Sequence, residues 1–409
     1  MKILFVHQNF PGQYLHLARH LGAIPGNEVV FITQRTDAEL PGVKKVLYKP
    51  QREITKGVHH YLRETEAGVL NAQNVARVAL GLKEKGFVPD VMLGHNGWGE
   101  IWYLKEVFPD TPLIGYFEFF YRLHGADVGF EPGPPAIFDV GPRIRTKNIG
   151  NLLALDAADY GQCPTQWQRS LYPKEYQSKI HIVHEGVDTQ LLVPDQTATF
   201  NIPNTDITLT TNDEVVTYVS RNLEPYRGFP TFMRSLPAIL AKRPNAHVLV
   251  VGGDDVSYGP KLAGDKNFRQ LLLAELGDSI DLSRVHFLGK VPYSSFVKIL
   301  QVSTVHVYLT YPFVLSWSML EAMSIGCVII GSRTQPVEEV IRDGENGVLV
   351  DIFKPEEVAE RVVDVLSDRT AFHTIRVHAR NTIVENYDLR SICLPAQIRL
   401  MKMAAKRML

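Results

Sequence analysis

Cysteine is scarce in this sequence, with three residues at positions 163, 327 and 393 among 409. Their odd number and wide spacing argue against a disulfide framework and fit a reduced, cytoplasmic chain. A surplus of either charge is also missing, because 43 Lys and Arg stand against 44 Asp and Glu. The net charge of −1 gives no electrostatic reason to expect nucleic acid, so we expect small molecules or other surfaces as partners.

Long apolar runs and targeting patterns are missing as well. No stretch approaches the roughly 20 apolar residues that span a bilayer. The opening "MKILFVH" reads as a strand, without the charged region, apolar stretch and cleavage site of a signal peptide. We therefore expect a cytoplasmic protein, with the inner face of the membrane as the alternative location.

The sequence does contain a sustained alternation of buried strands and helices. Its opening "MKILFVHQNFPGQYLHLARHLGAIPGNEVVFITQ" gives a strand, a Pro-Gly turn, a helix and a second strand, which is a βαβ unit. A second series starts at "VVTYVS" and continues through "HVLVVGG", "VHFLG", "VHVYLT", "CVIIGS" and "GVLV". A chain of 409 residues is too long for one ordinary core, so the pattern predicts two Rossmann-like α/β domains that face each other across a cleft.

The turn-rich segment after "HIVHEGVD" reads as the connection between these domains. We expect the first domain to cover residues 1–195 and the second residues 196–385. Residues 386–409 have apolar side chains at helical spacing with basic residues between them, which predicts a helix that packs back on the N-terminal domain. A membrane-facing helix is the alternative. Residues 124–146 are rich in Gly and Pro and read as a long loop.

Open parallel sheets bind ligands at the carboxyl ends of their strands, so candidate site residues should follow strands directly. Gly12 follows the first strand and precedes the first helix, where backbone can approach a phosphate; an ordinary turn glycine is an equal alternative. No G-x-G-x-x-G fingerprint is present, which argues against a nicotinamide dehydrogenase. Arg221 and Arg227 follow the first strand of the second domain, and two guanidinium groups there suit a diphosphate. Surface ion pairs are the alternative.

The segment "YPFVLSWSMLEAMSIG", residues 311–326, is almost wholly apolar but contains the carboxylate of Glu321. Burial of an unpaired carboxylate costs several kcal/mol, so this group either has a partner inside the protein or binds a ligand. Ser318 lies three residues earlier on the same helix face. A carboxylate only accepts hydrogen bonds, which suits the paired hydroxyls of a ribose. The N–H groups of residues 313–315, before the helix, would form an anion site.

No metal site is predicted. The "GGDD" at residues 252–255 reads as a loop after a strand. His59 and His60 are adjacent, and His181 and His184 would point to opposite faces of a strand, so neither pair suits a metal ion.

Several of these segments resemble the family 4 retaining glycosyltransferases, which have the GT-B fold. "SRNLEPYRGFPTFMRSLP" is similar to that family's arginine, basic residue and glycine signature, and the region from "VHFLGKVPYSS" to "VIIGS" is similar to its donor-binding core. "VEEVIRDGENGVLV" is similar to its following turn, and "KIHIVHEGVDTQLLVP" to the segment that closes its first domain. The resemblance covers most of the chain and is strongest from residue 180 to residue 366.

The resemblance implies a role for each matching residue. Arg221 and Arg227 would hold the donor diphosphate, Glu321 the donor ribose, and Lys290 with Val291 the base. Two residues of the first domain would add to this site: Gly12 would approach the phosphates, and His95, in "LGHNGWGE", would contact the donor sugar. A structural histidine is the alternative for His95.

One position departs from the family pattern. The family has two glutamates with the first at the position of Phe313, and a phenyl ring cannot accept a hydrogen bond from a sugar hydroxyl. Backbone N–H groups near Val314 and Leu315 would have to serve instead, which leaves the identity of the sugar open. The mechanism implied by the resemblance is retention without a metal ion, in which the departing phosphate takes the acceptor proton.

For the acceptor, the sequence offers "YFEFFYRLHGADVGF", which follows a strand of the first domain. Glu118, Tyr121 and His124 would form a wall of the acceptor site, and an aromatic core is the equal alternative. The apolar character of this segment favours a hydrophobic or lipid-linked acceptor.

These observations predict a retaining, metal-independent glycosyltransferase without a cofactor. It would move a hexose from a nucleotide sugar, UDP-glucose or a similar UDP-linked donor, to a glycan or glycolipid acceptor in polysaccharide biosynthesis. The alternatives are a nucleotide-sugar epimerase of the same architecture and a catalytically silent nucleotide-sugar-binding protein. A glycosidase would need a carboxylate pair across a cleft, which cannot be assigned.

Overall fold

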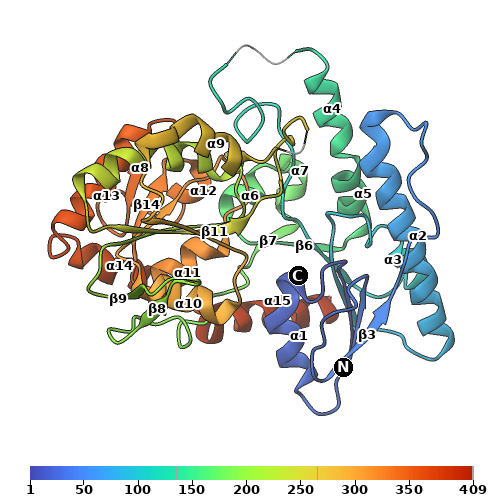
Figure 1. Ribbon diagram of the computed structural model, residues 1–409. Helices are drawn as coiled ribbons and strands as arrows, with labels where there is room; N and C mark the ends of the chain where they lie inside the picture. Colours follow the sequence, from blue (N-terminus) through green and yellow to red (C-terminus); the bar gives the residue numbers. More distant parts are fainter. Residues whose placement is uncertain (134–136, 265, 408–409) are drawn as a thin grey trace. The chain divides into compact units, whose positions relative to one another are not determined.

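The structure, a computed structural model shown in Figure 1, describes residues 1–133, 137–264 and 266–407. The chain divides into two units of similar size: residues 1–186 together with the C-terminal segment from residue 389, and residues 187–388. Each unit is an α/β structure around its own parallel sheet. Among the described residues, no helix combines the length and apolarity needed to cross a membrane.

The first unit is built on a seven-stranded sheet in the order β3-β2-β1-β4-β5-β6-β7, in which every neighbouring pair is parallel. Its strands are β1 (Lys2–Val6), β2 (Glu28–Thr33), β3 (Val43–Leu47), β4 (Val91–His95), β5 (Leu113–Tyr116), β6 (Tyr160–Cys163) and β7 (Ile180–Ile182). Its helices are η1 (Gly12–Tyr14), α1 (Leu15–Gly22), η2 (His60–Leu62), α2 (Arg63–Glu84), α3 (Leu104–Val107), α4 (Val140–Lys147), α5 (Ile149–Ala157), α6 (Gln166–Ser170) and α7 (Lys174–Gln177).

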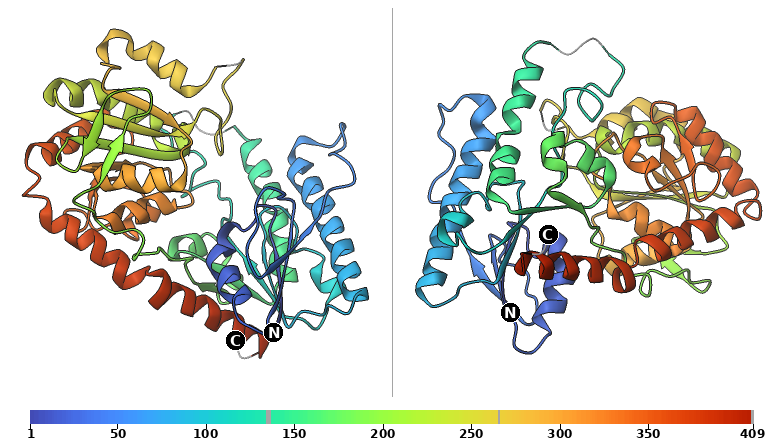
Figure 2. Two further views of the ribbon diagram at one scale, coloured as in Figure 1. Left: turned by 60° about the horizontal axis from the view of Figure 1, so that its bottom comes forward. Right: turned by 180° about the vertical axis from the view of Figure 1, so that it is seen from behind.

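The C-terminal segment completes this unit. A π-helical turn, η5 (Leu389–Cys393), leads into α15 (Leu394–Ala405), which lies beside α1 in both views of Figure 2. Three buried residues of α15 join the core that β1 and α1 form: Leu400, Met401 and Ala404. The buried apolar residues of α15 therefore pack against the first unit.

The second unit has a six-stranded parallel sheet in the order β12-β11-β10-β13-β14-β15. Its strands are β10 (Val215–Asn222), β11 (His247–Gly253), β12 (Val285–Gly289), β13 (Val305–Tyr308), β14 (Val328–Ser332) and β15 (Val348–Val350), with a separate antiparallel pair, β8 (Thr199–Asn201) and β9 (Thr208–Thr210). Its helices are η3 (Pro225–Arg227), α8 (Phe229–Lys242), α9 (Phe268–Leu276), η4 (Gly277–Ser279), α10 (Tyr293–Val302), α11 (Trp317–Ile325), α12 (Gln335–Glu338), α13 (Pro355–Ser367) and α14 (His373–Asn386).

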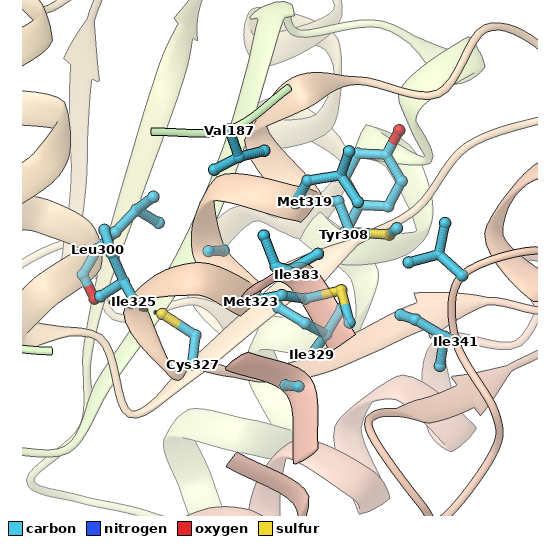
Figure 3. Close-up of a cluster of buried hydrophobic side chains, with 14 of the residues drawn as sticks. Val187, Leu300, Tyr308, Met319, Met323, Ile325, Cys327, Ile329, Ile341 and Ile383 are labelled. Carbon is cyan, nitrogen blue, oxygen red and sulfur yellow. Dashed lines mark hydrogen bonds between the residues drawn. The ribbon is translucent and has the colours of Figure 1, made fainter. Parts of the chain in front are cut away.

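A hydrophobic cluster fixes α11 on this sheet. Figure 3 shows Met319 and Met323 of α11 packed with Ile329 of β14 and Ile383 of α14, and all four side chains are buried. Apart from the exposed Trp317, the apolar residues of "SWSMLEAMSIG" are thus explained by burial on several sides. Trp317 and Glu321 are the two residues of α11 that are not buried.

The unit boundaries differ from those expected from the sequence. The first lies at Gly186/Val187, where the sequence predicted 195/196, because Val187 and Leu192 belong to the core of the second unit. The Ser324 hydroxyl also donates to the Leu192 carbonyl at 2.7 Å. The last boundary lies at Asp388/Leu389, where the sequence predicted 385/386.

The predicted loop at residues 124–146 is wrong at its end, because α4 begins at Val140. Pro142 lies in the first turn of this helix, where the missing N–H would have no helical partner and proline is tolerated. Residues 134–136 of the predicted loop lie outside the described residues, as do the last two residues, 408–409, of the predicted C-terminal segment.

The three cysteines are buried and form no disulfide, as their spacing predicts.

Candidate functional site

The sheet of the second unit reverses its strand order between β10 and β13. Open parallel sheets bind ligands at such a point, outside the carboxyl ends of the strands. The loop after β10 forms η3, and the loop after β13 contains Thr310. The two loops meet where Nη1 of Arg227 donates to Oγ1 of Thr310 at 2.8 Å.

Gly228 permits this close approach. Its backbone has a φ of +64°, in the left-handed region, and a Cβ built there would lie 2.3 Å from Cβ of Leu309. Any other residue would therefore combine strain with a clash. The Tyr311 N–H also donates to the Tyr226 carbonyl at 3.0 Å, which ties the loops together beside Gly228.

Arg227 is a buried cation held by neutral acceptors. Arg227 is 7% exposed. Its Nη1 donates to the Val314 carbonyl at 2.9 Å and to the Tyr308 hydroxyl at 3.3 Å. Within the described ranges no carboxylate forms an ion pair with it. A buried guanidinium without an anionic partner is costly, so this arrangement is suited to an anionic ligand.

Aromatic rings surround the same guanidinium. The Tyr258 ring lies over it, with 5.2 Å between the Arg227 Cζ and the ring centroid. Phe313 packs against the Tyr258 ring at 4.9 Å between centroids and edge-on against Tyr226 at 5.7 Å. Phe313 is 8% exposed, so the position that carries a glutamate in the family pattern is here part of an aromatic cluster.

Glu321 on α11 has one partner in the described structure. Oε1 accepts a hydrogen bond from the Tyr293 hydroxyl of α10 at 2.7 Å, and Oε2 makes no hydrogen bond to a described residue. Burial raises the pKa of Glu321, and the bond from Tyr293 opposes this rise. The carboxylate is therefore half satisfied inside the unit and has one oxygen left for a ligand.

Ser318 and the segment before it have a second role, in capping α11. The Ser316 side chain is the N-cap and accepts from the Ser318 N–H, and the two serine hydroxyl oxygens lie 3.0 Å apart. The N–H groups of residues 313–315 precede this cap. Val314 supplies a carbonyl to Arg227, and Leu315 is buried in the hydrophobic cluster that contains Met319 and Met323.

The other predicted donor residues of this unit lie at strand ends. Arg221 is exposed near the end of β10, and Lys290 is exposed directly after β12, followed by half-buried Val291. A Cβ on Gly253, at the end of β11, would lie 2.7 Å from Lys290 Cε and from Asn222 Oδ1. Asn222 Oδ1 is buried and has no hydrogen-bond partner within the described ranges, so Asn222 is a polar residue of this site that sequence reasoning missed.

The first unit has its own reversal of strand order, between β1 and β4. His7 follows β1, and its ring lies 4.8 Å from the ring of His95 at the end of β4. Gly12 has a φ of +51°, and a Cβ there would lie 2.6 Å from the His7 ring. The structure thus explains Gly12 by its close packing against His7, and its predicted approach to a phosphate remains a prediction.

His95 is a buried, neutral hydrogen-bond donor. Nδ1 accepts from the Gly97 N–H at 3.0 Å, so the proton of the neutral ring sits on Nε2. Burial, together with the neighbouring His7, lowers the pKa of His95 well below its usual value. Nε2 has no hydrogen-bond partner among the described residues and lies 3.7 Å from Oε2 of Glu118.

Glu118 and Tyr121 line one pocket with His95, of about 90 Å³. Other residues that line it are Glu64, Thr65, Asn96, Trp98, Trp102, Lys147 and Asn151. Sequence reasoning missed these residues because they come from three separate segments. Glu118 Oε1 accepts from Gln13 Nε2 at 3.1 Å. His124 is exposed and does not line this pocket, so the structure groups two of the three predicted acceptor residues.

Trp102 gives the pocket a second buried donor. Its Nε1 has no hydrogen-bond partner in the part of the chain that the structure describes. Its indole is held between Gly68 of α2 and Gly150 of α5, where an added Cβ would clash at 2.2 Å and 2.7 Å. The pocket therefore combines two indoles with carboxylate, amide and N–H groups, the mixture that binds hydroxyl-rich rings.

No group of three or more His, Cys, Asp and Glu side chains that could hold a metal ion occurs in the part of the chain that the structure describes.

Comparison with known proteins agrees with this architecture. A family model described as "Glycosyl transferase family 4 group" matches residues 25–192, and one described as "Glycosyl transferases group 1" matches residues 213–368. The Anabaena protein HepE, solved in complex with UDP and glucose, has 16% identity and a TM-score of 0.68, over 98% of this chain and all of that one. This likeness shows a shared GT-B fold.

Two curated relatives match part of the chain. An uncharacterized glycosyltransferase of Methanocaldococcus jannaschii is 29% identical over 34% of this chain, and D-inositol 3-phosphate glycosyltransferase of Corynebacterium glutamicum is 24% identical over 56%. The matches cover 33% and 53% of these relatives, so the chain spans a third to about half of their length.

Proposed function

The chain belongs to the family 4 glycosyltransferases of GT-B fold, and from this membership we propose that it moves a hexose from a UDP-linked sugar to a hydroxyl-rich acceptor. The acceptor would be a glycan or glycolipid in polysaccharide biosynthesis. The reaction would proceed with retention of configuration and without a metal ion.

The observation that carries this proposal is Arg227. A buried guanidinium at the strand-order reversal, without a carboxylate partner in the described chain, is suited to a diphosphate. Arg221, at the end of the same strand, would add a second positive charge. Both would stabilise the charge that grows on the departing diphosphate.

Glu321 would bind the donor ribose. Its unpaired Oε2 can accept from a ribose hydroxyl, whereas Oε1 is held by Tyr293. Ser318, one turn earlier on α11, lies on the same helix face and can add a hydroxyl contact. Lys290 and Val291 would contact the base through their backbone. UDP is supported as the leaving group by HepE, which was solved with UDP bound.

Phe313 leaves the donor sugar open. The aromatic cluster offers an apolar surface in place of a carboxylate, so N–H groups at Val314 and Leu315 would meet sugar hydroxyls. Gly12 and His95 of the first unit are proposed donor contacts on the family resemblance. The neutral His95 Nε2–H can donate to a sugar hydroxyl without adding charge.

In the proposed reaction the bond between the sugar C1 and the diphosphate oxygen breaks. A bond from C1 to the acceptor oxygen forms on the same face, and the acceptor proton passes to the departing phosphate. The products are the glycosylated acceptor and the nucleoside diphosphate. The protein contributes positioning and fixed positive charge, which need no rearrangement during the step.

The pocket beside His95 and Glu118 would hold the acceptor. Its carboxylates, amides and indoles favour a hydroxyl-rich ring, and the curated relative that acts on an inositol phosphate supports this class. Tyr121 lines the pocket, and His124 would contact a larger acceptor outside it. The polar lining weakens the expectation of a purely hydrophobic acceptor.

Turnover of a donor panel tests the proposal. The purified protein is incubated with UDP-, GDP- and ADP-sugars, with and without monosaccharide and cyclitol acceptors, and free nucleotide is followed by chromatography. We expect one donor to be consumed, faster with an acceptor, and this turnover to be lost in Arg227→Ala and Glu321→Ala. Conversion of the donor sugar without release of nucleotide would indicate an epimerase, and binding without turnover a silent binding protein.

A further inference from the structure

Glu224 is a buried carboxylate that the proposed reaction does not use. The residue is 0% exposed and lies between β10 and η3, three positions before Arg227. No cationic side chain forms an ion pair with it in the described ranges. Its partners are backbone N–H groups of the loop that follows β11.

Three successive N–H groups of this loop donate to Glu224. The Ser257 N–H donates to Oε1, and the Tyr258 and Gly259 N–H groups donate to Oε2, each at 3.0 Å. Hydrogen bonds to a charged acceptor are about twice as strong as neutral ones. The Asn222 side chain adds a bond of 2.8 Å from Nδ2 to the Ser257 hydroxyl. The loop is therefore fixed to the segment that carries Arg227.

The consequence of this attachment is the place of the Tyr258 ring. The ring centroid lies 5.2 Å from the Arg227 Cζ, and it lies 4.9 Å from the ring centroid of Phe313. A ring face over a guanidinium holds the planar fork in one orientation and excludes water from it, while the N–H edges remain able to meet an anion.

We propose that Glu224 is a positioning residue for the donor: its carboxylate binds the N–H groups of residues 257–259 and thereby holds the Tyr258 ring over the Arg227 guanidinium. The inference rests on the proposed function, because it assigns the diphosphate to Arg227. Glu224 itself does not contact the ligand. A glutamine in its place has an amide that donates, so it cannot accept from all three N–H groups.

A double-mutant cycle on UDP binding tests this inference. Calorimetry measures the UDP affinity of the wild type, Glu224→Gln, Tyr258→Ala and the double variant, with the unfolding temperature of each as a check on folding. Glu275→Gln, which changes a surface ion pair with Arg234 in the same unit, is the matched control. Each single variant should weaken UDP binding about tenfold, and the double variant also about tenfold, because both changes remove the same ring.

The outcomes separate the positioning role from a structural one. A double variant about a hundredfold weaker than the wild type would show independent effects and overturn the inference. Wild-type affinity in Glu224→Gln would also overturn it. If Glu224→Gln does not fold, Tyr258→Ala and Tyr258→Phe decide: the inference requires weaker binding in the first and retained binding in the second. A wild-type protein that binds no UDP would overturn the proposed function as well.

Discussion

The Tyr293 hydroxyl donates to Oε1 of Glu321 at 2.7 Å, which joins α10 to α11 at the edge of the candidate donor site. This single bond explains how an apolar helix tolerates a carboxylate, since it satisfies one oxygen and leaves the other for a ligand. It also makes the ionisation of Glu321 sensitive to Tyr293, because burial raises its pKa and Tyr293 lowers it.

Removal of this bond should change the pH dependence of donor binding. In Tyr293→Phe nothing from Tyr293 opposes the effect of burial, so the pKa of Glu321 should be higher than in the wild type. UDP affinity, which requires the ionised carboxylate, should then begin to fall at a higher pH. Calorimetric titrations across about pH 5 to 8 measure this. Identical profiles for the two proteins would contradict the assigned role of Glu321.

Gly228→Ala should be strongly destabilising, because it adds both a clash and a positive-φ penalty. An alanine Cβ would lie 2.3 Å from Leu309 Cβ. Gly344 is a matched control, since its φ is +75° and nothing lies within 4 Å of an added Cβ. We expect Gly344→Ala to cost about 1 kcal/mol and Gly228→Ala at least about 2 kcal/mol more in urea denaturation. An equal loss of stability in Gly228→Ala and Gly344→Ala would contradict this, and would mean that the loops after β10 and β13 separate at little cost.

Glu100 should make stability depend on pH. Burial raises its pKa from 4.5 to about 7, while hydrogen bonds from Tyr48 and backbone N–H groups oppose the rise. The folded protein therefore binds a proton that the unfolded chain has released, and the free energy of unfolding should fall as the pH rises from 4.5 to 7.

Glu100→Gln should remove this slope, which corresponds to about 3 kcal/mol. The exposed Glu84→Gln is the control and should leave the slope in place. Urea-denaturation midpoints across this pH range measure the effect. A slope that persists in Glu100→Gln would assign it to another group.

Glu118→Gln should affect the acceptor more than the donor. The variant loses a charged acceptor beside His95 Nε2 in the pocket, so the KM for the acceptor should rise about tenfold. Donor hydrolysis without an acceptor should change little, and exposed Glu106→Gln should change neither. If Glu118→Gln lost donor hydrolysis while Glu106→Gln retained it, Glu118 would belong to the donor site and the prediction would be wrong.

The elements of the fold are largely predictable from local pattern. The continuous apolar runs of "VVTYVS" and "VHVYLT" predict buried parallel strands, and both form as β10 and β13. The helix α4 was missed because Gly141 and Pro142 are turn signals in a sequence window, whereas Pro142 is acceptable in the first turn of a helix.

The candidate site is predictable only where a local pattern marks a residue. Arg227 follows from its place after the strand β10, and Glu321 from its charge in an otherwise apolar helix. The contact between Glu224 and Tyr258 cannot be predicted in this way, because the two residues are more than 30 positions apart in the sequence. Nothing in the sequence around Glu224 shows that backbone N–H groups will bind its carboxylate. His95 was predicted from the family resemblance, and its tautomer depends on the Gly97 N–H, which the sequence does not show.

The most direct test of the central claim is the affinity of UDP for Arg227→Ala, measured by calorimetry beside the wild type. Arg234→Ala, which removes an exposed arginine paired with Glu275, is the matched control. We predict saturable binding by the wild type and the control, and a loss of at least about a hundredfold in Arg227→Ala, because a buried guanidinium bound to phosphate contributes several kcal/mol. Equal affinities in Arg227→Ala and the wild type would contradict the account.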